Sequence, residues 1–474
     1  MIYLASAVDY STLNKDELIQ LLKRRDVERT RYGLVWERDE IEYDKALNDD
    51  FVALNLVPEL SVGESPWEHL LIEGENFDAL RYLRMTLSGR VKVIFIDPPY
   101  NTGNNDFIYN DRYIDGEDTF RHSKWLEFMY RRLLIARDLL KEDGIIFVNI
   151  GEDEFANLNL LMEKVFPGRK VTTFVWKRRI GASDEAGYNI STDHEYVMCY
   201  ANPGFSFTGA EKDLSKYSNP DKDLRGPWMS ADLTKAHTYL QRPNTYYPIF
   251  NPATETWYPC NPNNVWRFSS KTRLKPGQKI RSKPIEELIE DGKILFPEHD
   301  KIVIYKTKQE LLHAIKDGTA PTSLNENLPD LDFWICKKMS YGRPRYKRHV
   351  SEMKRDTKPL STLLATATER IPTDHATEYL SSGFTQEGTK LLANILGQKV
   401  FDYPKPLSLI KNLLAQSTSP NNGDIILDFF AGSGTTAHAV MELNNDDDGD
   451  RRCLSWYLAR RQPSKTPIKV FVAM

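Results

Sequence analysis

Residues 91–103 read VKVIFIDPPYNTG, and this stretch decides the fold class. Its apolar, β-branched start predicts a buried strand that stops abruptly at Asp97 and two prolines. Consecutive prolines fix the backbone and remove two donors, so their carbonyls are expected to point outward as acceptors. Asp97 would then present a carboxylate at the carboxyl edge of a sheet, where α/β proteins bind ligands. With the flat ring of Tyr100 beside it, the stretch predicts a pocket for a ring that carries an exocyclic amine; a proline-stiffened turn is the alternative.

A second strand–turn–helix signal lies far downstream, at residues 428–440, DFFAGSGTTAHAV. Gly432 and Gly434 carry no Cβ and tolerate positive φ, so a ligand can approach the backbone of this turn closely. The helix expected from about Thr435 would offer free N–H groups to an anionic group. The letters GSGTTA match the G-x-G-x-x-A dinucleotide fingerprint, and without a Lys before Thr435 a Walker-type phosphate loop is excluded. The turn predicts a nucleoside-containing cofactor, with a plain tight turn as the alternative.

Strand and helix patterns alternate over residues 66–205 and resume in residues 381–474, before the tail that follows about Arg452. This rhythm predicts an α/β fold with a largely parallel sheet covered on both faces. Residues 206–380 lose the rhythm and are rich in Pro, Asn and aromatic residues, so we expect an inserted domain there. Residues 1–65 are expected to form an N-terminal arm, helical and charged over 12–50.

Composition excludes several classes of protein. The 474 residues are 41% hydrophobic with a net charge of 63 − 67 = −4, which is ordinary for a soluble globular chain. No run of about 18 apolar residues indicates a membrane span, and the first twenty residues lack the features of a secretory signal. Four cysteines lie far apart without a C-x-x-C pair, which argues against a disulfide framework and a zinc site. We therefore expect a cytoplasmic protein without a membrane or a metal.

Local charge differs from the total. Residues 334–358 hold nine Lys/Arg and two acids, interleaved with aromatic residues. A basic segment of this kind suits contact with a polyanion through one face, although a solvated surface is the plainer interpretation. The candidate DNA contacts in it are Arg343, Arg345, Lys347 and Arg348. A second basic run, Lys177, Arg178 and Arg179, is a weaker candidate for phosphate contacts.

DPPY at 97–100, followed far downstream by FAGSG at 430–434, resembles the amino-methyltransferases of DNA in the permuted order called the β group. More closely, the chain resembles the modification subunit of type III restriction–modification systems, over roughly residues 35–205 and 385–452. Several blocks occur in the same order: LLIEGENFDAL (70–80), IDPPYNTGNNDFIYND (96–111), DGIIFVNIGEDEFANL (143–158), STDHEYVMCYA (191–201) and FDYPKPLSLIKNLL (401–414).

The resemblance implies a Rossmann-like, S-adenosylmethionine-dependent methyltransferase fold, permuted, with a target-recognition domain at 206–380. Residues 66–205 would be its catalytic half and residues 381–474 its cofactor-binding half. S-adenosylmethionine would donate the methyl group and the 6-amino group of adenine would accept it. The implied partners are double-stranded DNA, a second copy of the chain in a homodimer, and a separate restriction subunit with helicase and nuclease activities.

The resemblance also implies roles for single residues. Asp97 and the Pro98 carbonyl would accept the two amine protons, and Tyr100 would stack on an extruded adenine. Glu75 or Asn76 would lie near the adenosine of the cofactor. The expected catalytic residues are Asp97, Pro98, Pro99 and Tyr100, and the expected cofactor-binding residues are Lys405, Pro406, Asp428, Phe430, Ala431, Gly432 and Gly434.

The tail departs from the family pattern. The helix after the glycine turn should lead to a second strand that ends in an acid for the ribose hydroxyls. Instead residues 444–450 read NNDDDGD, no Asp or Glu follows from Arg451 to Met474, and the resemblance ends after about Arg452. We therefore expect a truncated or frame-shifted cofactor-binding half that lacks this acid and the sheet edge. A catalytically impaired remnant that binds DNA or a partner subunit is one alternative function, and a dinucleotide-dependent oxidoreductase is a remote one.

Overall fold

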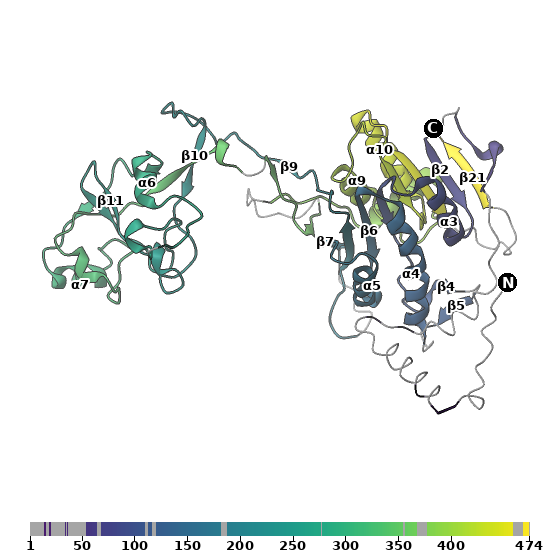
Figure 1. Ribbon diagram of the computed structural model, residues 1–474, viewed down its shortest axis with the longest axis horizontal. Coiled ribbons are helices and arrows are strands. Elements are labelled where there is room, and N and C mark those ends of the chain that lie inside the picture. The colour runs from purple at the N-terminus through teal and green to yellow at the C-terminus, as the bar shows by residue number, and fades with distance from the viewer. Residues whose placement is uncertain are drawn as a thin grey trace. The chain divides into compact units, whose positions relative to one another are not determined.

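The computed structural model describes residues 54–63, 68–109, 112–115, 120–181, 187–275, 277–353, 356–366, 377–457 and 468–473, and single residues 14, 15, 19, 34 and 36. The chain divides into a larger unit, residues 1–210 with 357–474, and a smaller unit, residues 211–356. Figure 1 shows the larger unit in colours from both ends of the scale, because it is discontinuous in sequence. Most of the helix expected over 12–50 lies outside the described residues. Trp36 is described and buried, and its indole nitrogen donates to Glu127 at 3.0 Å.

A sheet of ten strands forms the centre of the larger unit, in the order β1-β21-β2-β20-β19-β3-β6-β8-β7-β18. From β2 to β6 the neighbouring strands are parallel, and β8 lies antiparallel between β6 and β7. The bounds are β1 Leu54–Leu56, β2 His69–Glu73, β3 Val91–Ile96, β6 Leu140–Ile150, β7 Lys170–Lys177, β8 His194–Ala201, β18 Leu363–Leu364, β19 Ile425–Asp428, β20 Arg452–Tyr457 and β21 Ile468–Ala473.

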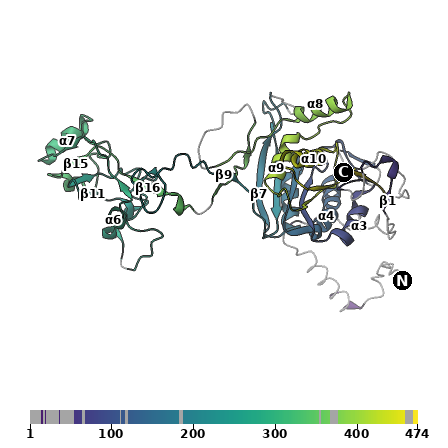
Figure 2. The same cartoon turned by 90° about the horizontal axis from the view of Figure 1, so that it is seen from above.

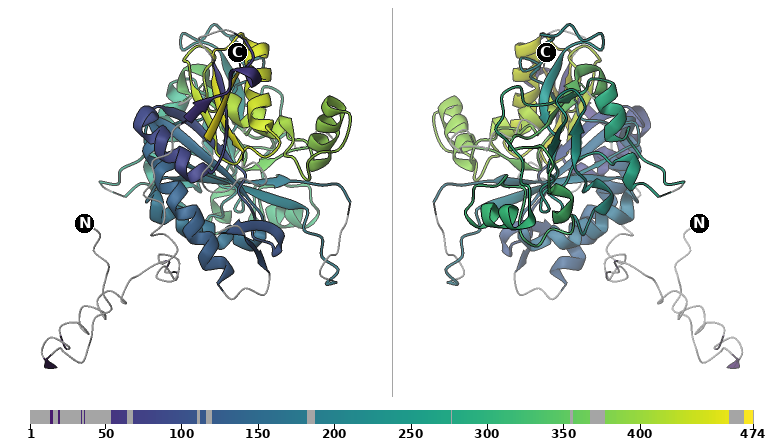
Figure 3. Two further views of the ribbon diagram at one scale, coloured as in Figure 1. Left: turned by 90° about the vertical axis from the view of Figure 1, so that its right-hand side faces the viewer. Right: turned by 90° about the vertical axis from the view of Figure 1, so that its left-hand side faces the viewer.

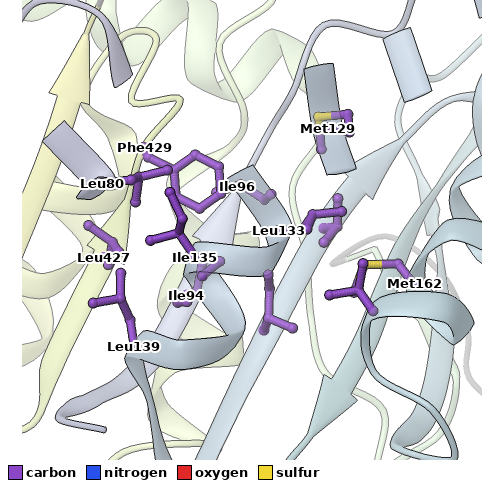
Figure 4. Packing of buried hydrophobic residues seen from close by; sticks show 14 of the residues in the cluster. Leu80, Ile94, Ile96, Met129, Leu133, Ile135, Leu139, Met162, Leu427 and Phe429 are labelled. Atoms are coloured by element: carbon purple, nitrogen blue, oxygen red, sulfur yellow. The ribbon is translucent and has the colours of Figure 1, made fainter. Parts of the chain in front are cut away.

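Helices cover both faces of this sheet. On β3, Ile94 and Ile96 belong to one buried cluster while Val93 and Phe95 belong to another, because successive side chains of a strand point to opposite faces. The first cluster, seen in Figure 4, includes residues of α3 (Asn76–Leu87), α4 (Arg121–Leu139) and α5 (Glu152–Val165). The second includes residues of α9 (Leu407–Ala415) and α10 (Thr435–Asp447). Figure 2 shows these two helix layers, and the predicted α/β fold class is confirmed.

Strand order brings the two sequence signals together. β19, which precedes the glycine turn, lies directly beside β3, which precedes DPPY, and the two strands are parallel. Their carboxyl ends therefore meet at one edge of the sheet. The larger unit also holds the 3-10 helix η2 (Pro58–Leu60), the hairpin of β4 (Asn104–Tyr109) and β5 (Arg112–Asp115), β17 (Thr357–Lys358) and α8 (Thr385–Leu396). β17 pairs with β9 (Ala210–Glu211), whose second residue is the first of the smaller unit.

The smaller unit has a core of its own, rich in aromatic side chains such as Tyr246, Tyr258, Trp266 and Trp334. Two small sheets, β10-β16-β13 and β11-β12-β15-β14, pack with short helices around it. The bounds are β10 Trp228–Asp232, β11 Ile249–Asn251, β12 Thr256–Tyr258, α6 Ile285–Glu290, β13 Ile294–Leu295, β14 Ile302–Val303, α7 Lys308–Lys316, β15 Met339–Ser340 and β16 Arg345–His349.

The far boundary of the insertion differs from the expected residue 380. The smaller unit ends at Asp356, and residues 357–380 fall to the larger unit. β18 lies in this segment and pairs in parallel with β7, with Leu364 buried against the sheet. Strands as short as two residues carry too little periodicity to be recognised in the sequence.

The expected loss of the second strand is wrong. Residues 452–457 form β20, which follows α10 and lies between β19 and β2. β21 then runs antiparallel along the other side of β2, so the yellow C-terminal strands lie beside the purple N-terminal ones in Figure 3. Trp456 is 1% exposed, and its indole nitrogen donates to the carbonyl of Gly74 at 2.8 Å. The tail thus supplies an interior strand, although β20 ends without a carboxylate.

We predict that Trp456→Ala lowers the free energy of unfolding by about 3–5 kcal/mol, because it removes a buried aromatic side chain from the main core. Urea unfolding followed by circular dichroism would measure the change. Arg452→Ala, an exposed position on the same strand, is the matched control and should stay within about 0.5 kcal/mol of the parent chain. Equal effects at both positions would contradict the placement of β20.

Candidate active site

The turn after β3 holds Asp97, Pro98, Pro99 and Tyr100 at the carboxyl edge of the sheet. Pro98 is buried, whereas Asp97 keeps 30% of its side-chain surface exposed. The carbonyl of Pro99 accepts a hydrogen bond from the indole nitrogen of Trp125 at 2.7 Å, which fastens the turn to α4. The two prolines therefore hold the side chains of Asp97 and Tyr100 on a rigid backbone.

A buried polar cluster supports the chain just past this turn. Asn101 has φ +58°, and its amide donates to the carboxylate of Glu154 at 2.5 Å. Glu154 has no exposed side-chain surface, and it also accepts from Asn157 at 2.7 Å and contacts His122 at 2.7 Å. The left-handed backbone at Asn101 is thus held by a fully engaged carboxylate on α5.

Four side chains, Asp97, Tyr100, Glu195 and Lys405, form what we call the Lys405 cluster. Tyr100 places its hydroxyl 2.8 Å from Glu195 Oε2 and 3.1 Å from Asp97 Oδ1. Lys405 Nζ lies 2.9 Å from Asp97 Oδ2 and 3.5 Å from Glu195 Oε2. The cluster joins the end of β3, the start of β8 and the segment that enters α9, three parts of the chain that are distant in sequence.

Burial and charge act against each other in this cluster. Burial raises the pKa of Asp97, while Lys405 lowers it, and the pKa stays above its ordinary value. Burial would lower the pKa of Lys405, but Asp97 and Glu195 raise it overall. Burial and both carboxylates raise the pKa of Tyr100 well above 10. Near neutral pH Lys405 is therefore a cation, and Tyr100 is a neutral phenol that can donate a hydrogen bond.

The glycine turn follows β19 as the sequence predicted. Gly432 and Gly434 have φ of +52° and +79°, and α10 begins at Thr435. Asp428 is buried and points into the turn, accepting from the backbone N–H of Phe430 at 2.9 Å and from the hydroxyl of Thr436 at 2.6 Å. Burial raises its pKa to about 7, and the nearby Asp97 contributes. Asp428 thus shapes the turn that a cofactor would approach.

The other expected cofactor residues lie around the same edge. Ala431 is buried and its N–H donates to the carbonyl of Trp456 at 2.7 Å, which ties the turn to β20. Pro406 is buried and precedes the first residue of α9. A Cβ on Gly432 would stand 3.2 Å from the ring of Phe401, so this phenylalanine lies against the turn. Phe401 was not singled out from the sequence.

Glu75 and Asn76 connect β2 to the same edge. Asn76 donates to the carbonyl of Phe429 at 2.8 Å and accepts from Arg132 Nε at 2.6 Å. Arg132 also pairs with Glu75 and lies 3.6 Å from the centre of the Phe128 ring. Asn76 therefore braces the end of β19, a contact that the spacing of the block LLIEGEN did not reveal.

The basic candidates of the smaller unit have different environments. Arg343, Arg345 and Arg348 are exposed. Lys347 is buried and forms ion pairs with Asp221 and, at 3.3 Å, with Asp223. Its position on β16 turns it toward the interior, where those two carboxylates engage its charge.

Two of the basic residues after β7 also have acidic partners. Arg178 Nε lies 3.6 Å from Glu195, and Arg179 Nε lies 3.5 Å from Asp193. Sequence reasoning missed Glu195 itself. The signal available for it was an acid at the start of the apolar strand EYVMCYA, where a charge must find a partner.

Among the described residues, no group of three or more His, Cys, Asp or Glu side chains is placed to hold a metal ion. In the same part of the chain, no helix combines the length and apolar character needed to cross a membrane.

The glycine turn and the Asp-Pro-Pro-Tyr turn thus stand at the carboxyl ends of two adjacent parallel strands. The chain belongs to the DNA methylase family, whose pattern matches residues 91–450. Membership of this family leaves the dinucleotide-dependent oxidoreductase alternative without support. That alternative rested on the letters GSGTTA and does not account for the DPPY turn.

Three individual proteins are similar to the chain over most of its length. The chain is 29% identical to the type III restriction-modification enzyme StyLTI Mod subunit of Salmonella typhimurium, covering 91% of the chain and 59% of the relative. It is 28% identical to the EcoPI Mod subunit of Escherichia phage P1, covering 92% and 65%. It is 29% identical to the type II methyltransferase M.KpnI of Klebsiella pneumoniae, covering 80% and 78%. The chain therefore spans less than two thirds of the length of these two type III relatives.

We predict that Asp428→Asn changes how stability depends on pH. Because the folded chain raises the pKa of Asp428 from 3.8 to about 7, it holds a proton there that the unfolded chain has lost. This contribution to stability is complete below pH 3.8 and is lost as pH rises through 7. The parent chain should lose about 2 kcal/mol in total between pH 5 and 7 relative to Asp428→Asn. Urea unfolding at pH 5, 6 and 7 measures this, and parallel profiles would contradict the buried, protonated carboxyl.

Proposed function

We propose that this chain is a site-specific DNA methyltransferase that transfers a methyl group from S-adenosylmethionine to the 6-amino group of adenine. One observation carries the proposal. The rigid Asp-Pro-Pro-Tyr turn with its carboxylate follows β3, and the adjacent strand, β19, leads into a glycine turn that begins a helix. The first turn suits an exocyclic amine, and the second suits a nucleoside cofactor.

The residues of the glycine turn fit S-adenosylmethionine. Gly434 leaves the backbone open to a ligand, because nothing lies within 4 Å of the place a Cβ would take there, whereas the Phe401 ring lies against Gly432. The start of α10 offers N–H groups. Those two glycines, with Phe430, Ala431 and the buried Asp428, would hold the nucleoside part, while Lys405 and Pro406 would lie toward the methionine part. When bound, the cofactor supplies an electrophilic methyl group on a sulfonium that leaves as a neutral thioether.

Asp97, Pro98 and Tyr100 would carry the chemistry on the adenine. The Asp97 carboxylate and the Pro98 carbonyl accept the two amine protons, which aims the nitrogen lone pair at the methyl carbon. Once the amine nitrogen has accepted the methyl group, Asp97, whose pKa burial raises, would be placed to receive the surplus proton. Positioning supplies most of the rate. Stacking on Tyr100 offsets the cost of extruding the base, on the order of a few kcal/mol.

We further propose that the chain is the modification subunit of a type III restriction–modification system. The two type III relatives support this assignment, because they match across nine tenths of the chain. The proposed partners are double-stranded DNA, a second copy of the chain and a separate restriction subunit, and the proposed location is the cytoplasm. Residues 211–356 would be the target-recognition domain, since they form a separate compact unit with exposed arginines.

We predict that Asp97→Ala abolishes methyl transfer and leaves S-adenosylmethionine binding within about threefold, because the carboxylate acts on the amine and not on the cofactor. Tritium transfer to genomic DNA and calorimetric titration measure the two effects. Asp143→Ala is the control and should remain active. It removes a carboxylate of β6 that pairs with Lys92, near the amino end of that strand.

An active Asp97→Ala chain would refute the role of Asp97. Failure of the parent chain to bind S-adenosylmethionine while folded would instead favour the impaired remnant. NAD in the same titration should give no heat of binding.

We predict that the triple variant Arg343→Ala, Arg345→Ala, Arg348→Ala binds duplex DNA more weakly and with a smaller salt dependence. Each lost phosphate contact should reduce the slope of log K against log salt by about 0.9. Lys347 is left in place because it is buried and its ammonium group is engaged by Asp221 and Asp223. The control removes three exposed lysines of the same unit, Lys306, Lys308 and Lys316. Equal slopes for the triple variant and this control would rule out the arginines as the DNA contact.

A further inference from the structure

Both oxygens of Asp97 already have partners in the Lys405 cluster. Oδ1 lies 3.1 Å from the hydroxyl of Tyr100, and Oδ2 lies 2.9 Å from Nζ of Lys405. A target amine that donates to Asp97 must therefore share or displace one of them. Lys405 is a buried cation and would lose its closest counter-charge if it moved. The hydroxyl of Tyr100 is the partner that can be given up more readily.

Glu195 offers that hydroxyl a second acceptor. Its carboxylate stands at the start of β8 with 11% of its side chain exposed, and its Oε2 lies 2.8 Å from the Tyr100 oxygen. This distance is shorter than the 3.1 Å to Asp97. A phenol carries one proton and donates one strong hydrogen bond. The proton of Tyr100 therefore goes mainly to Glu195, which leaves Oδ1 of Asp97 available.

The carboxylate of Glu195 is needed to balance the positive charges around the Lys405 cluster. Lys405 lies between Asp97 at 2.9 Å and Glu195 at 3.5 Å, and Arg178 lies 3.6 Å from the other oxygen of Glu195. Two carboxylates thus face two cations. Without Glu195, Lys405 and Tyr100 would both turn to Asp97, and both of its oxygens would be occupied.

We propose that Glu195 is a positioning residue for methyl transfer: it draws the Tyr100 hydroxyl away from Asp97 and shares Lys405, so that Asp97 Oδ1 is open to the target amine. This inference rests on the function proposed above and assigns to it a residue that acts through its neighbours. Glu195 touches neither the base nor the cofactor in this account. A residue that only stabilised β8 would not affect the protonation or the partners of Asp97.

A double-mutant cycle between Glu195 and Tyr100 tests the proposal. Glu195→Ala should lower kcat for methyl transfer by about 100-fold, while the KM for DNA and the Kd for S-adenosylmethionine stay within about twofold. Glu195→Gln, which can still accept from the hydroxyl, should recover at least tenfold of that loss. Adding Tyr100→Phe to Glu195→Ala should cost less than the two single losses multiplied, because no hydroxyl remains to occupy Asp97.

The matched control is a second Tyr–Glu pair, formed by Tyr200 of β8 and Glu163 of α5. Tyr200 donates its hydroxyl to Glu163 at 3.1 Å, at the opposite end of β8 from Glu195. Glu163→Ala should leave kcat unchanged. Thermal unfolding of every variant, followed by circular dichroism, separates loss of fold from loss of rate, and Glu195→Gln serves if Glu195→Ala does not fold.

Three results would overturn the proposal. The first is a folded Glu195→Ala chain with unchanged kcat, and the second is a folded Glu195→Gln chain whose kcat is no higher than that of Glu195→Ala. The third is a double variant in which the two single losses simply multiply. Each of these requires an active parent chain. A parent chain that transfers no methyl group to any DNA overturns the proposed function instead, and the inference about Glu195 falls with it.

Discussion

A single buried cation holds the candidate site together. Lys405 lies between the carboxylates of Asp97 and Glu195, with the ring of Tyr100 4.9 Å from its nitrogen. Buried charges persist in proteins only when they are paired, and removal of one partner usually costs several kcal/mol. Because Lys405 and its partners come from three segments that are distant in sequence, their pairing fixes the end of β3, the start of β8 and the entry to α9 relative to one another. The turn that presents Asp97 depends on this arrangement.

Sheet topology brings the second half of the site beside the first. β19 and β20 come from the end of the described chain, yet they lie between β2 and β3 in the sheet. Asp428 then closes the glycine turn from inside, and Asn76, the first residue of α3, donates to the carbonyl of Phe429 at the end of β19. A permuted chain order is compatible with this geometry because parallel strands need only lie side by side, in whatever order they are connected.

Local patterns predicted the parts of the fold that depend on nearby residues. VKVIFID is apolar and ends at two prolines, so both the strand and its stop could be read directly. The partners of a charged side chain could not be predicted in this way. Lys347 lies in a basic segment that suggested contact with DNA, whereas on β16 its side chain pairs with Asp221 and Asp223. The strand β20 was not predicted because no acid ends it, although the letters CLSWY are apolar enough to fill an interior position.

The most direct test of the account is the identity of the base that the chain modifies. Unmethylated genomic DNA would be incubated with the chain and S-adenosylmethionine bearing a deuterated methyl group, then digested to nucleosides and analysed by mass spectrometry. We predict that the labelled nucleoside is deuterated N6-methyl-2′-deoxyadenosine. Label in a methylated cytosine, or no label from a folded chain that binds the cofactor, would contradict the proposal that Asp97 and Tyr100 present the 6-amino group of adenine for transfer.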